Sequence, residues 1–145
     1  NGVGELLVRP PNTAIDLADD RVTTDGFVRT GDLARIDDAD FVWIEGRAGD
    51  LINRGGNKVF PDEVEEVLRS VAGVDDVAVF AAPDDRLGEV PVAAIVGDVD
   101  DETLDTTVRA NLAPYKAPTV YHHVTALPRS EVGKVLRRRL AEEFA

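Results

Sequence analysis

The sequence predicts an α+β fold: a small antiparallel β-sheet with helices packed on it, preceded by a short β-rich segment. From about residue 51, β-rich runs and helical stretches follow one another in the order ββ-α-β-β-α-β-α. Before that point the chain holds only short β-rich runs bounded by Gly, Pro and Asp. The 145 residues, 43% of them apolar, suffice for one compact domain of ordinary size.

The β-rich segment is predicted to contain a hairpin. GELLVRP (4–10) and GFVRTGDLARID (26–37) are predicted strands, and FVWIEGR (41–47) is the return strand. The DDAD sequence at 37–40 is the turn between them, where Asp40 can adopt a positive φ.

The hairpin brings two charged residues to one edge. Pairing Ile36 with Phe41 places Asp32 beside Glu45, and therefore near Arg47. A carboxylate and a guanidinium in this position could hydrogen-bond vicinal hydroxyls such as those of a ribose. A surface ion pair that contributes little to stability is an equal alternative.

The remaining elements follow from turn and helix signals. The run 51–60 is a predicted hairpin whose tip, Gly55-Gly56, needs the backbone freedom of glycine. Pro61 suits the first turn of an amphipathic helix at 61–71. Further predictions are strands at 74–84 and 89–97, a helix capped by Asp101 and ending near Leu112, a connector at 113–118, a strand at 119–127 and a last helix from about Lys134 to Phe144.

Composition excludes several functions. A formal net charge of −12 argues against nucleic-acid binding, because phosphate backbones attract basic surfaces. No apolar run is long enough for a membrane span. The absence of cysteine rules out disulfides, thiolate metal sites and cysteine nucleophiles, and it fits a cytoplasmic protein. The chain also lacks methionine and begins at Asn1, so we expect it to be a piece of a longer protein.

Four motifs are better explained by structure than by chemistry. GGNKV lacks the spacing of a phosphate loop, and DVDDETL has Thr103 where a calcium loop needs glycine. Adjacent strand residues point to opposite faces, so His122 and His123 cannot act together as ligands, and no metal site is predicted. Trp43 is most simply a packing residue.

The C-terminal end holds the second candidate site. A proline, a polar run and Gly133 predict an exposed loop that ends at a helix start, directly before Lys134. A lysine there is a compact point charge suited to an anionic oxygen, such as that of a phosphate. A charged surface helix is the alternative, since basic residues cluster here: Arg129, Lys134, Arg137, Arg138 and Arg139.

Taken together and in this order, the motifs resemble the adenylate-forming superfamily of acyl-CoA synthetases, luciferases and peptide-synthetase adenylation domains. The resemblance covers nearly the whole chain but only the C-terminal third of the family. It implies that 1–48 is the β-hairpin tail of a large N-terminal adenylation domain and that 49–145 is the mobile C-terminal domain. The motifs are GELLVRP, FVRTGDLARID, GRAGDLINRGGNKVFPDEVEEVL, PDDRLGEVPVAAIV, LAPYKAP and LPRSEVGKVLRRRL.

The resemblance implies an ATP-binding and a catalytic role for three residues. Asp32, assisted by Arg47, would bind the ribose hydroxyls of ATP. Lys134 would be the adenylation lysine, reaching the substrate carboxylate and the α-phosphate of ATP. Mg²⁺ would neutralise the departing pyrophosphate.

For the second half-reaction the family rotates its C-terminal domain. Gly55 and Gly56 would line the pantetheine tunnel of CoA, and Gly88 and Glu89 would support that face. Weaker candidates for the CoA phosphates are Lys116, Arg137 and Arg138, for which a solvated surface position is an equal alternative.

Two positions depart from the family pattern. The family usually has an acidic residue or lysine as a hinge two positions after the arginine, where this chain has Gly49. Glycine would loosen the hinge, or Asp50 would take over the role. Val132 stands where a small or polar residue is usual, which would alter the packing of the Lys134 loop.

We therefore predict the C-terminal portion of a cytoplasmic, AMP-forming acyl-CoA synthetase, with a carboxylic acid, ATP and CoA as substrates. The fragment alone is expected to be inactive. One alternative is an enzyme that loads an amino or aryl acid onto a carrier protein. Another is a binding module that docks CoA or a carrier protein without catalysis, although such a module has no use for an adenylation lysine.

Overall fold

The computed structural model describes residues 2–9, 11 and 21–144, and the chain divides into two compact units, Asn1–Gly49 and Asp50–Ala145. Pro10, the predicted end of the first strand, lies outside the described residues. Within the described ranges, no helix has the length and apolar character needed to cross a membrane.

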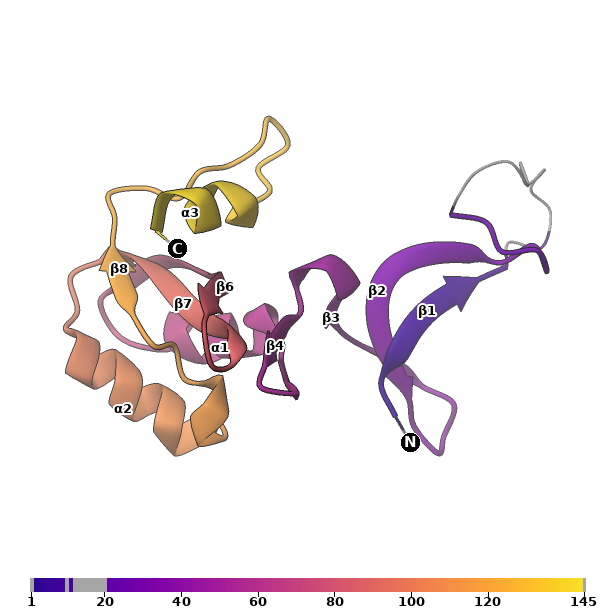
Figure 1. Ribbon diagram of the computed structural model, residues 1–145, viewed down its shortest axis with the longest axis horizontal. Coiled ribbons are helices and arrows are strands. Elements are labelled where there is room, and N and C mark those ends of the chain that lie inside the picture. Colours follow the sequence, from indigo (N-terminus) through magenta and orange to yellow (C-terminus); the bar gives the residue numbers. More distant parts are fainter. Residues whose placement is uncertain (1, 10, 12–20, 145) are drawn as a thin grey trace. The chain divides into compact units, whose positions relative to one another are not determined.

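The first unit is a three-stranded antiparallel sheet in the order β1-β2-β3 (Figure 1). Its strands are β1 (Gly4–Val8), β2 (Val28–Ile36) and β3 (Val42–Arg47).

The turn between β2 and β3 is built around one carboxylate. Asp40 has a φ of 62°, as its position in the turn predicted. Asp37 accepts hydrogen bonds from the Trp43 indole (2.8 Å) and from the backbone N–H groups of Phe41 and Ala39. These bonds, that of Trp43 first, lower the pKa of Asp37. Trp43 is therefore half exposed: its ring packs against Arg35, as a packing residue would, and its N–H also supports the turn.

The second unit is an α+β fold, as predicted. Its sheet has the order β5-β4-β7-β6, with β8 beside β7. All pairs are antiparallel except β7–β8, which is parallel and so departs from the predicted sheet. The elements are the 3₁₀ turn η1 (Ala48–Asp50), which straddles the unit boundary, β4 (Ile52–Arg54), β5 (Asn57–Val59), α1 (Pro61–Arg69), β6 (Val74–Asp84), β7 (Gly88–Gly97), α2 (Asp101–Asn111), the 3₁₀ turn η2 (Pro114–Lys116), β8 (Tyr121–His123) and α3 (Arg137–Phe144).

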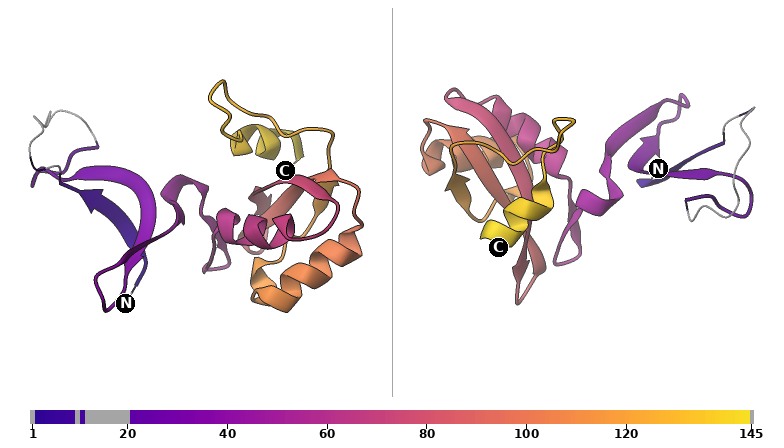
Figure 2. Two further views of the ribbon diagram at one scale, coloured as in Figure 1. Left: turned by 180° about the vertical axis from the view of Figure 1, so that it is seen from behind. Right: turned by 90° about the horizontal axis from the view of Figure 1, so that it is seen from above.

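The sheet of the second unit is covered on both faces, which gives three layers (Figure 2). The central stretches of β6 and β7, residues 77–82 and 90–96, are apolar at every position, so alternate side chains enter two different cores. Helices α1 and α2 cover one core, in which Val64, Leu68, Leu104 and Val108 pack on Val77, Val79 and Ile95. Helix α3 covers the other core, in which Leu140 packs with Phe80, Val92 and Leu127.

Two predicted helix starts need correction. Helix α2 begins at Asp101, but its cap is the preceding residue Asp100, whose carboxylate accepts from the backbone N–H of Thr103 (2.8 Å). Helix α3 begins at Arg137, three residues later than predicted, because residues 128–136 form hydrogen bonds with one another. Strand β8 is also shorter than predicted.

The two adjacent histidines contact different elements, in line with the predicted opposite faces of a strand. The ring of His122 stacks on Phe144 of α3 at a centroid distance of 4.6 Å. His123 Nε2 lies 2.8 Å from the Asp101 carboxylate at the start of α2. Both therefore tie helices to β8.

Candidate functional site

In the first unit, Asp32 and Arg47 lie directly opposite each other. The loop after Ile36 is one residue longer than predicted, and a β-bulge at Glu45 adds another. The predicted pairing of Asp32 with Glu45 is therefore wrong, and its actual partner is Arg47. The predicted proximity of Asp32 to Arg47 is thus reached through a different register.

The Asp32–Arg47 pair is held by the strand that carries it. Arg47 Nε lies 2.9 Å from Asp32 Oδ1, and Arg47 Nη1 donates to the carbonyl oxygen of Thr30 (3.2 Å). The hydroxyl of Thr30 accepts from the backbone N–H of Asp32 (3.0 Å). The pair stays partly exposed, so it can offer both acceptors and donors to a diol.

In the second unit, Lys134 lies on a short hydrogen-bonded loop. The backbone N–H of Gly133 donates to the carbonyl of Ser130, and Gly133 has a φ of 81°, which closes a tight turn. Ser130 holds Lys134 from both sides: its N–H donates to the Lys134 carbonyl (2.8 Å), and its hydroxyl accepts from the Lys134 N–H (3.1 Å). The side chain of Arg129 donates hydrogen bonds to the carbonyl of Gly133 and to the carboxylate of Asp76 on β6.

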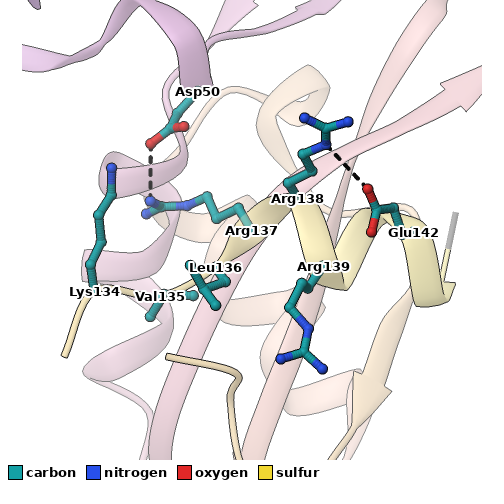
Figure 3. Close-up of a pocket in the computed structure, with 8 residues that line it drawn as sticks. All are labelled: Asp50, Lys134, Val135, Leu136, Arg137, Arg138, Arg139 and Glu142. Atoms are coloured by element: carbon teal, nitrogen blue, oxygen red, sulfur yellow. Dashed lines mark hydrogen bonds and ion pairs between the residues drawn. The ribbon is translucent and has the colours of Figure 1, made fainter. Parts of the chain in front are cut away.

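Lys134 opens onto a pocket of about 360 Å³ (Figure 3). Within the described part of the chain, its ammonium group has no hydrogen bond or ion pair. The pocket lies at the start of α3, and its lining residues are Asp50, Lys134, Val135, Leu136, Arg137, Arg138, Arg139 and Glu142.

Arg137 is the centre of a charge network that the sequence did not reveal. Its guanidinium donates to the carboxylates of Asp50 (3.1 Å), Asp62 (2.9 Å) and Glu65 (2.8 Å), and to the carbonyl of Val79 (3.0 Å). Its side chain is only 18% exposed. Burial favours a lower pKa for Arg137, but the carboxylates, Glu65 first, raise it above its ordinary value. Arg137 is therefore not free for a CoA phosphate, which corrects that expectation.

The β4–β5 hairpin carries the glycine pair at its tip. Gly55 and Gly56 both have positive φ, 56° and 88°, as the predicted turn requires. Three residues of the hairpin hydrogen-bond to neighbouring segments. The Gly55 N–H donates to the Leu87 carbonyl (2.8 Å), and Glu89 accepts from the Asn53 N–H (2.8 Å). Arg54 donates to the carbonyl of Tyr115 in η2 (2.7 Å).

Lys116 of η2 has a carboxylate partner. Its ammonium lies 2.6 Å from both oxygens of Glu63 on α1, and only 17% of its side chain is exposed. Binding of a CoA phosphate by Lys116 would have to displace Glu63. Arg138, in contrast, is almost fully exposed, and its guanidinium forms an ion pair with Glu142.

Comparison with known proteins matches this fold and these motifs. The family model of the AMP-binding enzyme C-terminal domain matches residues 63–134. The chain is 40% identical to a long-chain-fatty-acid–CoA ligase of Bacillus subtilis, over 97% of this chain and 27% of the relative. It is 36% identical to a 2-succinylbenzoate–CoA ligase of Listeria monocytogenes, over 98% of this chain and 32% of the relative. The chain thus spans about a third of the length of the curated relatives it matches.

A solved structure extends the match to three dimensions. The o-succinylbenzoate CoA synthetase of Bacillus subtilis, in complex with its acyl-adenylate intermediate, superimposes with a TM-score of 0.89 at 34% identity, over 96% of this chain and 30% of that chain. The chain belongs to the adenylate-forming superfamily. The resemblance seen in the sequence is therefore confirmed, and the second unit is the superfamily's C-terminal fold.

The candidate residues of this superfamily member fall into separate groups. Asp32 and Arg47 lie together in the first unit, which also contains Gly49. In the second unit, Lys134 and Asp50 share one pocket. Gly55, Gly56 and Lys116 form a third group, in which Arg54 joins the hairpin to η2.

Sequence reasoning missed three residues of this superfamily member. Arg137 looks like its neighbours Arg138 and Arg139 in the sequence, and the motifs assign no separate role to Glu65 or Arg54. The one available signal was Glu65, which falls between Val64 and Leu68 on the apolar stripe of α1. Glu65 is only 3% exposed, and a charge in such a position needs a partner.

Proposed function

We propose that this chain is the C-terminal part of an ATP-dependent, AMP-forming acyl-CoA synthetase of the cytoplasm. One observation carries the proposal: a lysine on a hydrogen-bonded loop presents to an open pocket an ammonium group that has no partner among the described residues. The CoA ligases among its relatives support the choice of a carboxylic acid, ATP and CoA as substrates.

In the proposed first half-reaction, a carboxylate oxygen of the substrate attacks the α-phosphorus of ATP, and the bond to the β-phosphate oxygen breaks. The products are the acyl-adenylate and pyrophosphate. The reaction brings two anions together, so the Lys134 ammonium lowers the barrier by stabilising the negative charge between them. Asp32 and Arg47 would hold the ribose hydroxyls during this step.

Mg²⁺ would neutralise the pyrophosphate as it leaves. The described residues contain no group of three or more His, Asp and Glu side chains suited to a metal.

In the proposed second half-reaction, the CoA thiol loses its proton to solvent and its sulfur bonds to the acyl carbonyl carbon. The bond from that carbon to the phosphate oxygen breaks, and AMP leaves. We assign the approach of the pantetheine arm to the β4–β5 hairpin, where two successive glycines leave the backbone uncovered. Glu89 and Arg54 would keep this hairpin in place through their bonds to Asn53 and to η2.

The division of labour between these two regions can be tested in the full-length enzyme. Lys134→Ala should lower acyl-adenylate formation by about 10²-fold or more, since it removes the charge that stabilises the transition state. Thioester formation from supplied acyl-adenylate should stay within about threefold, because that step involves no attack on the α-phosphate. ATP–pyrophosphate exchange measures the first step, and release of AMP from added acyl-adenylate and CoA measures the second.

Gly56→Leu is the matched variant, expected to impair thioester formation and to spare adenylation. A Cβ at Gly56 would meet no heavy atom within 4 Å, so we expect the added side chain to obstruct the ligand, although the positive φ adds strain. Thioester formation should fall while exchange persists. If both variants impaired the same half-reaction, the assignment of two separate regions would be wrong. If a pantetheinylated carrier protein reacted and CoA did not, the acceptor would be corrected.

A further inference from the structure

We propose that Arg137 is a positioning residue that keeps the Lys134 ammonium available by holding the carboxylate of Asp50. The inference rests on the proposed function, because it concerns the availability of the adenylation lysine. The observation behind it is the distribution of charges in the pocket at the start of α3 (Figure 3).

The pocket contains two carboxylates, and an arginine holds each of them. Asp50 is bound by Arg137 (3.1 Å) and Glu142 by Arg138 (3.1 Å). Lys134 is left as a cation without a carboxylate within the described part of the chain. An exposed lysine beside a free carboxylate would form an ion pair, so the arrangement of the two arginines keeps Lys134 open to an incoming anion.

Asp50 is the carboxylate that Lys134 would meet first. Figure 3 shows the Lys134 side chain extending to the Asp50 side of the pocket, whereas Arg139 points to the opposite side. The Asp50 side chain is 28% exposed, so it can turn toward another cation once its partner is lost. The engagement of Asp50 therefore decides whether the Lys134 ammonium is free.

Arg137 can hold Asp50 because its other bonds keep the guanidinium in place. The Glu65 carboxylate is buried, and the Val79 carbonyl belongs to a fully buried residue of β6. Glu65 has further donors in the Val79 N–H (2.8 Å) and Arg69 (2.7 Å), so it stays partnered when Arg137 is replaced. Replacement of Arg137 therefore leaves the buried carboxylate with two donors, so the proposal can be tested by mutation.

Asp62 provides a matched control. It binds the same guanidinium at 2.9 Å, but it lies on α1 and does not line the Lys134 pocket. Releasing Asp62 should not affect Lys134. The test thus compares two carboxylates that share one arginine and differ in their access to the lysine.

The experiment measures the reactivity of Lys134 in the full-length enzyme with acetic anhydride at fixed pH, followed by peptide mass spectrometry. The exposed Lys58 on β5 serves as the internal reference. An ammonium paired with a carboxylate loses its proton less readily, so in Arg137→Gln we expect Lys134 to be acetylated about three- to tenfold more slowly. Adding Asp50→Asn should restore the wild-type rate, and adding Asp62→Asn should not.

Unchanged labelling of Lys134 in Arg137→Gln would overturn the proposal, as would equal restoration by the two asparagine variants. If Arg137→Gln fails to fold, Arg137→Lys gives the same test. A single ammonium satisfies the buried Glu65 before Asp50, so the same slowing and the same selective restoration are expected.

ATP–pyrophosphate exchange is the second readout. It should fall in Arg137→Gln by about as much as the labelling rate and recover with Asp50→Asn. A residue that acts only through stability would not be rescued by losing a further partner. If the labelling pattern holds and the wild-type enzyme shows no exchange, the proposed function fails while the role of Arg137 stands.

Discussion

Two carboxylate–guanidinium pairs bridge the same two strands, β2 and β3, and they differ in what they offer to a ligand. Arg35 lies over the Trp43 ring and binds Glu45 at 2.7 Å. Arg47 is fixed to the strand through the Thr30 carbonyl, next to Asp32. Only the second pair has the geometry that we assign to a ribose.

This difference gives a prediction for the full-length enzyme. Asp32→Ala should raise the KM for ATP by about 10- to 100-fold, because hydrogen bonds to a charged group contribute about 1.5–3 kcal/mol. Glu45→Gln removes the matching charge from the neighbouring pair and should leave the KM within about twofold. Steady-state kinetics of pyrophosphate release would check both values. Equal effects of the two changes would show that the pair serves the sheet and not the nucleotide.

The sequence predicted which residues lie near each other better than it predicted the pairing register of the strands that carry them. It brought Asp32 near Arg47, yet the bulge at Glu45 that aligns them is set by hydrogen bonding across two strands and has no local signature. The three arginines of α3 look alike in the sequence. Tertiary contacts bury Arg137 among Glu65, Asp50 and Asp62, and leave Arg138 in solvent.

Among the elements, η1 connects the last strand of the first unit to the second unit and contains the predicted hinge, Gly49. A Cβ at Gly49 would meet no heavy atom within 4 Å. The described geometry therefore does not require glycine here. What glycine adds at this position is backbone freedom, which is the property that a hinge uses.

Proline and alanine at position 49 distinguish a loss of backbone freedom from the mere addition of a side chain. Gly49→Pro fixes φ near −65° and should slow thioester formation by about tenfold while sparing adenylation. Gly49→Ala should change either half-reaction by about threefold at most, since the side chain fits. Single-turnover measurements of each half-reaction would separate the two variants. Unchanged thioester formation in Gly49→Pro would place the hinge elsewhere.

Element types were predicted well, and element ends less well. Strands β6 and β7 follow from long apolar runs that only a sheet covered on both faces can bury. The start of α3 was placed too early because Ser130 and Pro128 provide hydrogen bonds that compete with the helix for Lys134 and Leu136. The side chain of Ser130 is a local signal, but its partner becomes clear only once the loop has closed.

For the whole molecule, the fold class was predictable and the site only in part. The order of elements and their apolar patterns are sufficient to define the three layers of the second unit. The network of Arg137 joins residues as far apart in sequence as Asp50 and Arg137, so no local pattern can reveal it. The distribution of charge along the sequence indicated only that the C-terminal end of an acidic chain is basic, and it did not identify the partners of these basic residues.

The size of the chain leads to the last prediction. Residues 1–145 correspond to about a third of the curated relatives, so the isolated chain should give no ATP–pyrophosphate exchange above background. Lys134 by itself offers a charge but no pocket that encloses a nucleotide. The same assay, run with the full-length enzyme as a positive control, checks this. Measurable adenylation by the isolated chain would refute the proposed division between the two parts.

Val132 gives the Lys134 loop a property that its charges do not suggest. It is 90% exposed and lies in the turn between Ser130 and Gly133. An apolar side chain thus accompanies the cation at the end of the loop. Dissolved salt screens the attraction between charges but not the removal of apolar surface from water. Docking of this loop onto another surface should therefore persist at ionic strengths that would weaken a purely charged contact.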